Sequence, residues 1–253
     1  MKKLIFLIFC AACVAAPFFV SRVAQPPEYH DFADRREWLG IANFGDVASN
    51  VPFMIVGILG ISFLLKEKAK AKFKTDWERS LYIIFFIGVF FTVFGSSFYH
   101  LAPSNLRVMW DRFPIAVACG ALTLILIAER VSLAASQWLT VPVLTYSIGS
   151  VAYWYFTETA GVGDLRFWGL AQFFPAVAIP VMFLLFPANY SKQYYYFAAI
   201  GCYAAAKLLE VWDRQTYEIL RFVSGHSLKH LFAAFAAYLL LVMIQKRQIR
   251  QLS

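Results

Sequence analysis

The chain of 253 residues is 60% hydrophobic and only 15% charged, and its mean hydropathy is +0.61. Soluble domains are about half apolar and about a quarter charged, so this composition excludes an ordinary soluble protein and predicts an integral membrane protein. The net charge of +8 does not indicate a nucleic-acid partner. The basic residues cluster in short segments between apolar runs, where they orient helices in a lipid bilayer.

The first apolar run covers residues 4–20 and follows two lysines. A basic start before an apolar run is typical of a cleaved signal peptide and also of an uncleaved helix that anchors the chain. We expect the uncleaved helix, because no clear small-residue cleavage site ends the run. Residues 1–27 are thus predicted to form an N-terminal hydrophobic helix and its linker.

Seven further apolar segments follow the polar stretch 21–43, and each is close to the ~20 residues that cross a bilayer. They cover approximately residues 44–65, 80–100, 111–129, 138–156, 167–187, 193–210 and 226–245. The loops between them are short, and no internal repeat is visible. We therefore predict an all-α membrane protein, in which residues 28–253 form a seven-helix bundle behind the N-terminal helix.

Lys and Arg residues in the loops predict the orientation of this bundle. With the N-terminus inside, the inside segments hold thirteen basic residues and the outside segments hold eight. The loop 66–79 supplies most of the difference. Positive loops remain cytoplasmic, so we expect a cytoplasmic C-terminus.

Three of the four histidines lie at the ends of predicted spans. His226 and His230 are four residues apart on the last span, so they share a helix face at the spacing at which two imidazoles bind one metal ion. His100 ends the second span of the bundle. The predicted topology brings all three to similar depth near the outer face of the membrane. The sequence thus predicts a three-histidine metal site, whereas His30 lies in a polar loop.

Asp111 and Ser96 are the polar residues predicted to lie closest to this site. Asp111 opens the next span after a ten-residue loop, 101–110, which returns it to the level of His100. Alone it is typical of a helix N-cap, but beside three histidines we expect a general base. Ser96 lies one turn before His100 on the same face. It either bonds back to the preceding turn or donates a hydrogen bond to the reacting group.

Two further polar groups lie on single helix faces. Asp46, Ser49 and Asn50 share a face at the start of the first span of the bundle. They either form a helix cap and interhelical network or orient the metal ligands, and both interpretations stay open. The second group recurs every three residues and consists of Lys207, Glu210 and Asp213. We interpret it as an internal ion-pair network.

Three histidines leave the fourth position of a tetrahedral zinc ion open for water, as in catalytic zinc sites. With Asp111 as the base and Ser96 beside the zinc, the fitting chemistry is hydrolysis of an amide or ester. A site between membrane helices suits a lipid substrate. Two alternatives remain: a receptor- or channel-like protein with structural zinc, and a haem protein with histidines as axial ligands.

Taken together, these residues resemble the alkaline ceramidases, a family within a seven-helix superfamily that includes the adiponectin and progestin receptors. The motifs that carry the resemblance are Ser96-x-x-x-His100, Asp111, His226-x-x-x-His230 and the segment Asp46 to Phe53. The resemblance covers roughly residues 28–245. It implies zinc bound by the three histidines, catalysis supported by Asp111 and Ser96, and cleavage of ceramide to a sphingoid base and a fatty acid.

The resemblance also suggests a calcium site, because eukaryotic members of the family bind calcium through acidic residues and a glutamate ahead of the first bundle helix. Here Asn43 stands at the glutamate position, and Asp31 and Asp34 are spaced differently, so calcium binding by these residues is left open. The extra N-terminal span and the Met-Lys-Lys start look bacterial. We therefore expect a bacterial inner-membrane protein whose substrate is ceramide or another N-acyl lipid.

Overall fold

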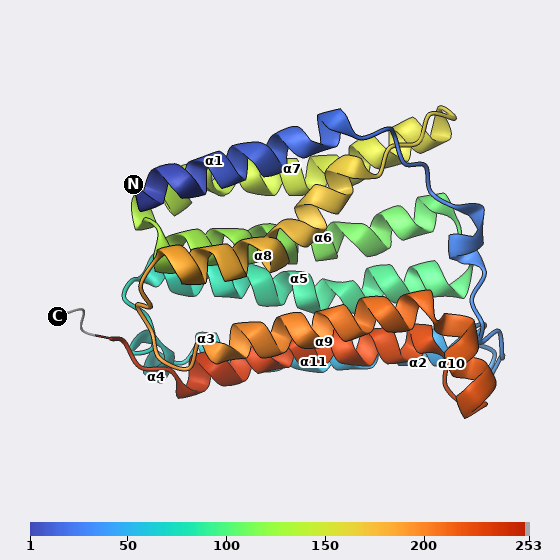
Figure 1. Ribbon diagram of the computed structural model, residues 1–253. Helices are drawn as coiled ribbons and strands as arrows, with labels where there is room; N and C mark the ends of the chain where they lie inside the picture. Colours follow the sequence, from blue (N-terminus) through green and yellow to red (C-terminus); the bar gives the residue numbers. More distant parts are fainter. Residues whose placement is uncertain (251–253) are drawn as a thin grey trace.

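The computed structural model describes residues 1–250, which are helical with two isolated β-bridges and no strand. The long helices lie side by side and run alternately in opposite directions (Figure 1). They are α1 (Lys2–Ala15), α3 (Val51–Leu64), α5 (Asp76–Leu101), α6 (Asn105–Arg130), α7 (Leu133–Thr159), α8 (Arg166–Leu185), α9 (Tyr194–Val211) and α11 (Gly225–Lys246). The short helices are α2 (Phe44–Ala48), α4 (Glu67–Lys70) and α10 (Asp213–Leu220), with 3-10 turns η1 (Ala16–Phe19) and η2 (Pro27–His30).

Six helical segments among the described residues are long and apolar enough to cross a membrane. They are Lys2–Phe19, Phe44–Leu64, Asp76–Leu101, Asn105–Arg130, Arg166–Leu185 and Gly225–Lys246. The prediction of an all-α protein with membrane-spanning character is therefore confirmed. Helices α7 and α9 occupy the two remaining predicted spans but are not among the six.

The connection between α5 and α6 is shorter than predicted. Ser104 accepts a hydrogen bond from the Arg107 backbone N–H, which caps α6 and starts the helix at Asn105 rather than at residue 111. The connection is therefore residues 102–104, not ten residues. Asp111 lies about two turns inside the helix. Its interpretation as an N-cap is wrong.

The first span of the bundle is interrupted. Helix α2 ends at Ala48 and α3 begins at Val51, with Pro52 in the first turn of α3. Proline has no backbone N–H and is favoured in a first turn, where that donor has no partner within the helix. The single span predicted over 44–65 is thus two helices, and the short α2 lies at the end of the bundle where α11 begins (Figure 1).

Two glycines allow close backbone contacts beside the histidines. A methyl group at Gly95 would overlap the Trp110 carbonyl oxygen and would lie 3.1 Å from the Asp111 Cα atom. A methyl group at Gly225 would overlap the Leu209 carbonyl oxygen and would lie 2.7 Å from the Asp213 Cα atom. Small residues of this kind let membrane helices approach closely. Gly95 thus allows α6 to pack closely against α5, and Gly225 allows the start of α11 to pack closely against the end of α9.

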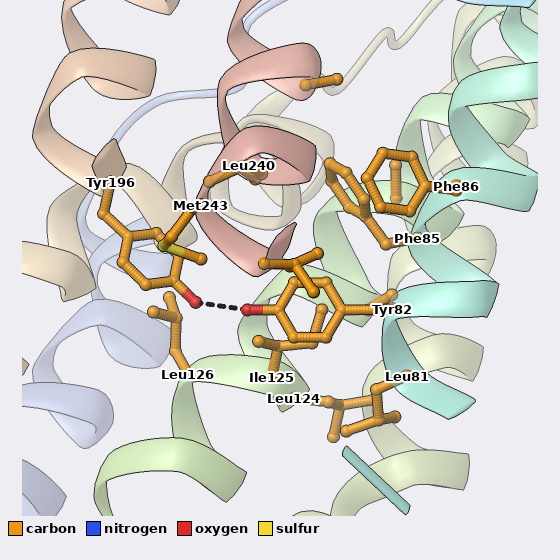
Figure 2. Close-up of a cluster of buried hydrophobic side chains, with 14 of the residues drawn as sticks. Leu81, Tyr82, Phe85, Phe86, Leu124, Ile125, Leu126, Tyr196, Leu240 and Met243 are labelled. Atoms are coloured by element: carbon orange, nitrogen blue, oxygen red, sulfur yellow. Dashed lines mark hydrogen bonds between the residues drawn. The ribbon is translucent and has the colours of Figure 1, made fainter. Parts of the chain in front are cut away.

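The other end of the bundle is held by a buried polar network within a hydrophobic cluster. The Tyr82 and Tyr196 hydroxyls are 2.8 Å apart, at the centre of the side chains in Figure 2. Both donate to the Glu129 carboxylate, at 3.0 and 3.1 Å, and Arg247 Nη1 donates to it at 2.5 Å. Glu129 and Arg247 are fully buried. The network joins α5, α6 and α9 to the chain that follows α11.

Candidate metal centre

Three buried imidazoles meet where α5 ends and α11 begins. His100 is 0% exposed, and His226 and His230 are each 3% exposed. The ring centroids are 4.8, 5.0 and 4.9 Å apart, and the potential ligand atoms all lie within 4.8 Å of one another. Within residues 1–250 this is the only group of three or more such side chains arranged to hold a metal ion.

The hydrogen bonding of His100 fits a metal ligand. Neither ring nitrogen has a hydrogen-bond partner, although both are buried. A neutral imidazole carries one donor and one acceptor, and leaving a buried polar group unpaired costs about 1–3 kcal/mol. A metal ion accepts the free lone pair of one nitrogen and removes part of this cost. The residues present therefore fit a metal ion bound by three imidazoles.

Ser49 orients His230. The Ser49 hydroxyl donates its single hydrogen to the Asp46 carbonyl oxygen at 3.0 Å, and its oxygen lies 2.8 Å from His230 Nδ1. Because the hydrogen of Ser49 is already used, the Ser49 oxygen is the acceptor and Nδ1 carries the proton. The lone pair of a neutral His230 ring is then on Nε2. A hydrogen bond from the second ring nitrogen is the usual way in which a protein fixes the tautomer of a metal-binding histidine.

Asp46 joins α2 to the first turn of α11. Its buried carboxylate accepts hydrogen bonds from the Ser224 hydroxyl at 3.0 Å and the Ser227 hydroxyl at 2.7 Å. Ser224 in turn caps α11 by accepting from the Ser227 backbone N–H at 2.9 Å. The Asn50 amide donates only to the Asp46 carbonyl oxygen, at 2.8 Å. Each of the two interpretations therefore holds for one residue. Asp46 forms an interhelical network, and Ser49 contacts the metal-site residue His230. Asn50 bonds only within its own segment.

Asp111 and Ser96 line the same cavity as His230. Asp111 is 7% exposed and Ser96 is 1% exposed, and one carboxylate oxygen of Asp111, Oδ1, has no hydrogen-bond partner. An unpaired oxygen on a buried carboxylate is available to accept a proton from a molecule bound in the cavity. The structure therefore places both predicted residues in the wall of the cavity that His230 also lines.

The cavity has a volume of about 440 Å³, within the usual range for ligand pockets. Its wall includes Gln25, Tyr29 and His230 and continues to Tyr196 and Leu240. Leu240 is ten residues beyond His230 on α11, so the cavity extends about 15 Å along the bundle. Most of the lining side chains are apolar. A cavity of this shape and composition suits a long apolar chain with its polar end at the histidines.

The candidate calcium ligands Asp31, Asp34 and Asn43 all have other partners. Asp31 pairs with two arginines. Burial raises the pKa of Asp34, but hydrogen bonds from Arg36 Nε at 2.8 Å and Nη2 at 2.7 Å outweigh burial and hold that pKa below its ordinary value. The Asn43 amide donates to the His100 carbonyl oxygen at 2.8 Å. Calcium binding stays a prediction, and the geometry shows both carboxylates neutralised by arginine.

The predicted ion-pair network includes Lys207 and Glu210 but not Asp213. Glu210 pairs with Lys207, and its second partner is Lys229 at 3.2 Å. Asp213 belongs to α10 and accepts hydrogen bonds from backbone N–H groups, including that of His226 at 2.7 Å. It satisfies a free donor in the first turn of α11, where no helical partner exists.

Sequence reasoning missed two side chains at the centre. The Phe32 ring lies 4.6 Å from the His100 ring and 4.5 Å from the His226 ring, and it is 4% exposed. It contacts two of the three histidines from the side of the polar linker. Its signal in the sequence is an apolar residue within a polar, charged stretch. The other is Lys229, whose Nζ lies 2.7 Å from His226 Nε2, and no local pattern distinguishes it.

No model of a known protein family matches this sequence, and no curated protein matches it either. What the protein does is therefore inferred from its residues and geometry. Among the described residues, these give a buried three-histidine group that could hold a metal ion and an apolar cavity that reaches it.

Proposed function

We propose that the protein is a zinc-dependent intramembrane hydrolase that cleaves the amide bond of ceramide or a related N-acyl lipid. The products are a sphingoid base, or another amine lipid, and a fatty acid. One observation carries the proposal: His230, one of three buried histidines grouped as metal ligands, lines an elongated apolar cavity whose wall also includes Asp111 and Ser96. The resemblance of these same residues to the alkaline ceramidases supports it.

The proposed architecture is a bundle of seven membrane-spanning helices with one additional helix, α1, at the N-terminus. Helices α7 and α9 supply the two spans beyond the six apolar ones. Helix α4, in the basic loop, and the end of α11 lie at the same end of the bundle, opposite the histidines (Figure 1). The positive-inside rule then supports a cytoplasmic C-terminus and a site near the outer face of a bacterial inner membrane.

Zinc is the metal that best suits this ligand set. Three neutral imidazoles without a thiolate or a fourth histidine match catalytic zinc sites, which keep one position open. Imidazole also binds copper, iron and nickel, so the ligand type alone leaves several metals. The neighbouring carboxylate and hydroxyl favour zinc hydrolysis, because that chemistry needs a proton acceptor and an oxyanion donor but no redox partner.

The chain's own residues supply the remaining parts of an amide hydrolysis. A zinc ion held by the histidines supplies Lewis-acid polarisation and activates a water molecule. Asp111 accepts the proton of the attacking water and returns it to the leaving amine nitrogen. Ser96 donates a hydrogen bond to the substrate carbonyl oxygen as negative charge develops there. The apolar walls bind the acyl chain and exclude bulk water.

The test is product analysis with matched histidine variants. Purified protein should contain about one zinc ion per chain and should release a fatty acid from at least one member of a panel of N-acyl lipids, detected by mass spectrometry. His226→Ala and His230→Ala should lose both zinc and hydrolysis. His30→Ala is the control, because its ring bonds to Tyr99 and Asn105 outside the three-histidine group.

Three results would contradict the proposal. Full metal occupancy in both His226→Ala and His230→Ala would exclude the three-histidine site. A strong visible absorption band in the purified protein would indicate haem instead of zinc. A zinc-loaded, folded protein that hydrolyses no lipid of the panel would favour the receptor-like alternative with structural zinc.

A further inference from the structure

Arg112 is a buried cation without an acidic partner. Its side chain is 5% exposed, and it forms no ion pair with any Asp or Glu within residues 1–250. Nη2 donates to the Gln25 side-chain oxygen at 2.5 Å, while Nη1 has no hydrogen-bond partner. The guanidinium lies 4.1 Å from the Trp154 ring centre and 5.5 Å from that of Tyr29. Aromatic faces stabilise the positive charge but accept none of its ordinary hydrogen bonds.

Arg112 lies in the wall of the cavity that reaches the histidines. It directly follows Asp111 in the chain, so its position is next to the proposed base. Besides Asp111 and Arg112, the charged side chains of the wall are Glu210, Lys207 and Lys229, and the single glutamate pairs with both lysines. Three cations therefore share the cavity wall with two carboxylates, and Arg112 is the cation that forms an ion pair with neither carboxylate.

A buried charge without an ion pair inside a membrane protein is costly and indicates a functional partner. The planar guanidinium is suited to binding phosphate or carboxylate through two parallel hydrogen bonds, and Nη1 is the donor that lacks an acceptor here. We propose that Arg112 binds an anionic group, phosphate or carboxylate, at the polar end of the lipid that occupies the cavity. The substrate class is then an acidic N-acyl lipid. This substrate assignment rests on the proposed hydrolysis, whereas the binding site itself does not.

Binding of single-chain amphiphiles tests the anion site without any turnover. Hexadecyl phosphate, hexadecanoate and hexadecanol share one apolar chain and differ only in the head. At least one of the two anions should bind the full-length protein more tightly than the alcohol, on the order of tenfold to a hundredfold, the range for hydrogen bonds to a charged group. Whichever anion shows the preference identifies the acid as phosphate or carboxylate. Inorganic phosphate should compete poorly, because it lacks the chain.

The matched variants are Arg112→Gln and Arg107→Gln. Both remove one arginine from α6, but Arg107 contacts Phe98 and the Phe98 carbonyl oxygen and does not line the cavity. Arg112→Gln should reduce the preference for the anion to about one, and Arg107→Gln should keep it. The preference should also persist after the metal is removed with a chelator, since the metal is not the proposed binding group.

Several outcomes would overturn the proposal. Equal binding of both anions and the alcohol to the wild-type protein would by itself refute the anion site. The test therefore does not depend on the folding of a variant. A preference that survives in Arg112→Gln, or that disappears with the metal in wild type, would place the anion elsewhere. Efficient competition by inorganic phosphate would indicate a site for free phosphate rather than for a lipid head.

Turnover then separates the two proposals. N-acyl lipids with a phosphate or carboxylate head should be cleaved with higher kcat/KM than a neutral ceramide, and Arg112→Gln should remove that difference through KM. Hydrolysis that favours neutral lipids would contradict the role of Arg112 and keep the hydrolase. Anion binding by Arg112 without any hydrolysis would contradict the hydrolase and keep the anion site.

Discussion

Ser49→Ala removes the one side-chain hydrogen bond that holds the His230 ring. The bond joins the Ser49 oxygen to His230 Nδ1 at 2.8 Å and fixes the proton on Nδ1. Without it, a buried N–H has no acceptor, which costs about 1–3 kcal/mol. The ring also becomes less basic at Nε2 and free to take the other tautomer. Loss of such an outer hydrogen bond weakens metal binding by about 10–100-fold, in agreement with that energy.

The assay is a zinc competition titration against a chelator of known affinity. Ser49→Ala should raise the zinc dissociation constant by about 10–100-fold. Ser62→Ala is the control, because Ser62 is an exposed serine on the neighbouring α3. Ser49→Thr keeps a hydroxyl and should retain most of the affinity. Wild-type zinc affinity in a folded Ser49→Ala variant would refute the assignment of Nε2 as the ligand atom.

Three predictions concern the rest of the molecule. Hydrogen bonds from Arg166 hold the pKa of Asp164 below its ordinary value, so the carboxylate stabilises the fold above its unfolded pKa and loses this effect as the pH falls through the lower folded pKa. Asp164→Asn should therefore lower the melting temperature at neutral pH and have little effect at a pH below the folded pKa of Asp164. An equal loss of stability at both pH values would contradict this prediction. Glu129→Gln leaves Arg247 buried without its counter-charge and should cost about 3–5 kcal/mol in thermal unfolding, whereas the double variant with Arg247→Met should recover most of the loss. Wild-type stability of the single variant would show that the pair contributes little. A reporter at the C-terminus should read as cytoplasmic, and an extracytoplasmic signal would reverse the orientation.

The positions of the histidines could be predicted because local patterns encode them. The spacing of His226 and His230 fixes a shared helix face, and alternation of spans brings His100 to the same end of the bundle. Helix ends were less accessible to hydropathy, since α6 begins with polar residues that lower its apolar average. The N-cap signal of Ser104 and the Pro52 signal for the break between α2 and α3 were both present in the sequence.

The remaining parts of the site depend on contacts between distant segments. Arg112 donates a hydrogen bond to Gln25, 87 residues earlier, and Phe32 reaches the histidines from the polar linker. Lys229 on α11 forms an ion pair with Glu210 on α9. Neither periodicity nor composition shows which of several arginines lacks an acid or which loop aromatic is buried. Such facts follow only from how the helices pack. Close contacts at glycines such as Gly95 allow that packing.

The final prediction uses the revised position of Asp111. Because Ser104 caps α6, Asp111 contributes nothing to the start of the helix, and one of its buried carboxylate oxygens has no partner. Asp111→Asn removes a buried charge while keeping the shape of the side chain, so thermal stability and zinc content should stay unchanged or rise. The amide cannot accept a proton at neutral pH, so hydrolysis should fall by roughly a hundredfold or more. Turnover is then lost without any loss of stability or zinc, which a purely structural role cannot produce. Zinc content, melting temperature and turnover must come from one preparation, and near wild-type turnover in a folded, zinc-loaded variant would remove Asp111 from the mechanism.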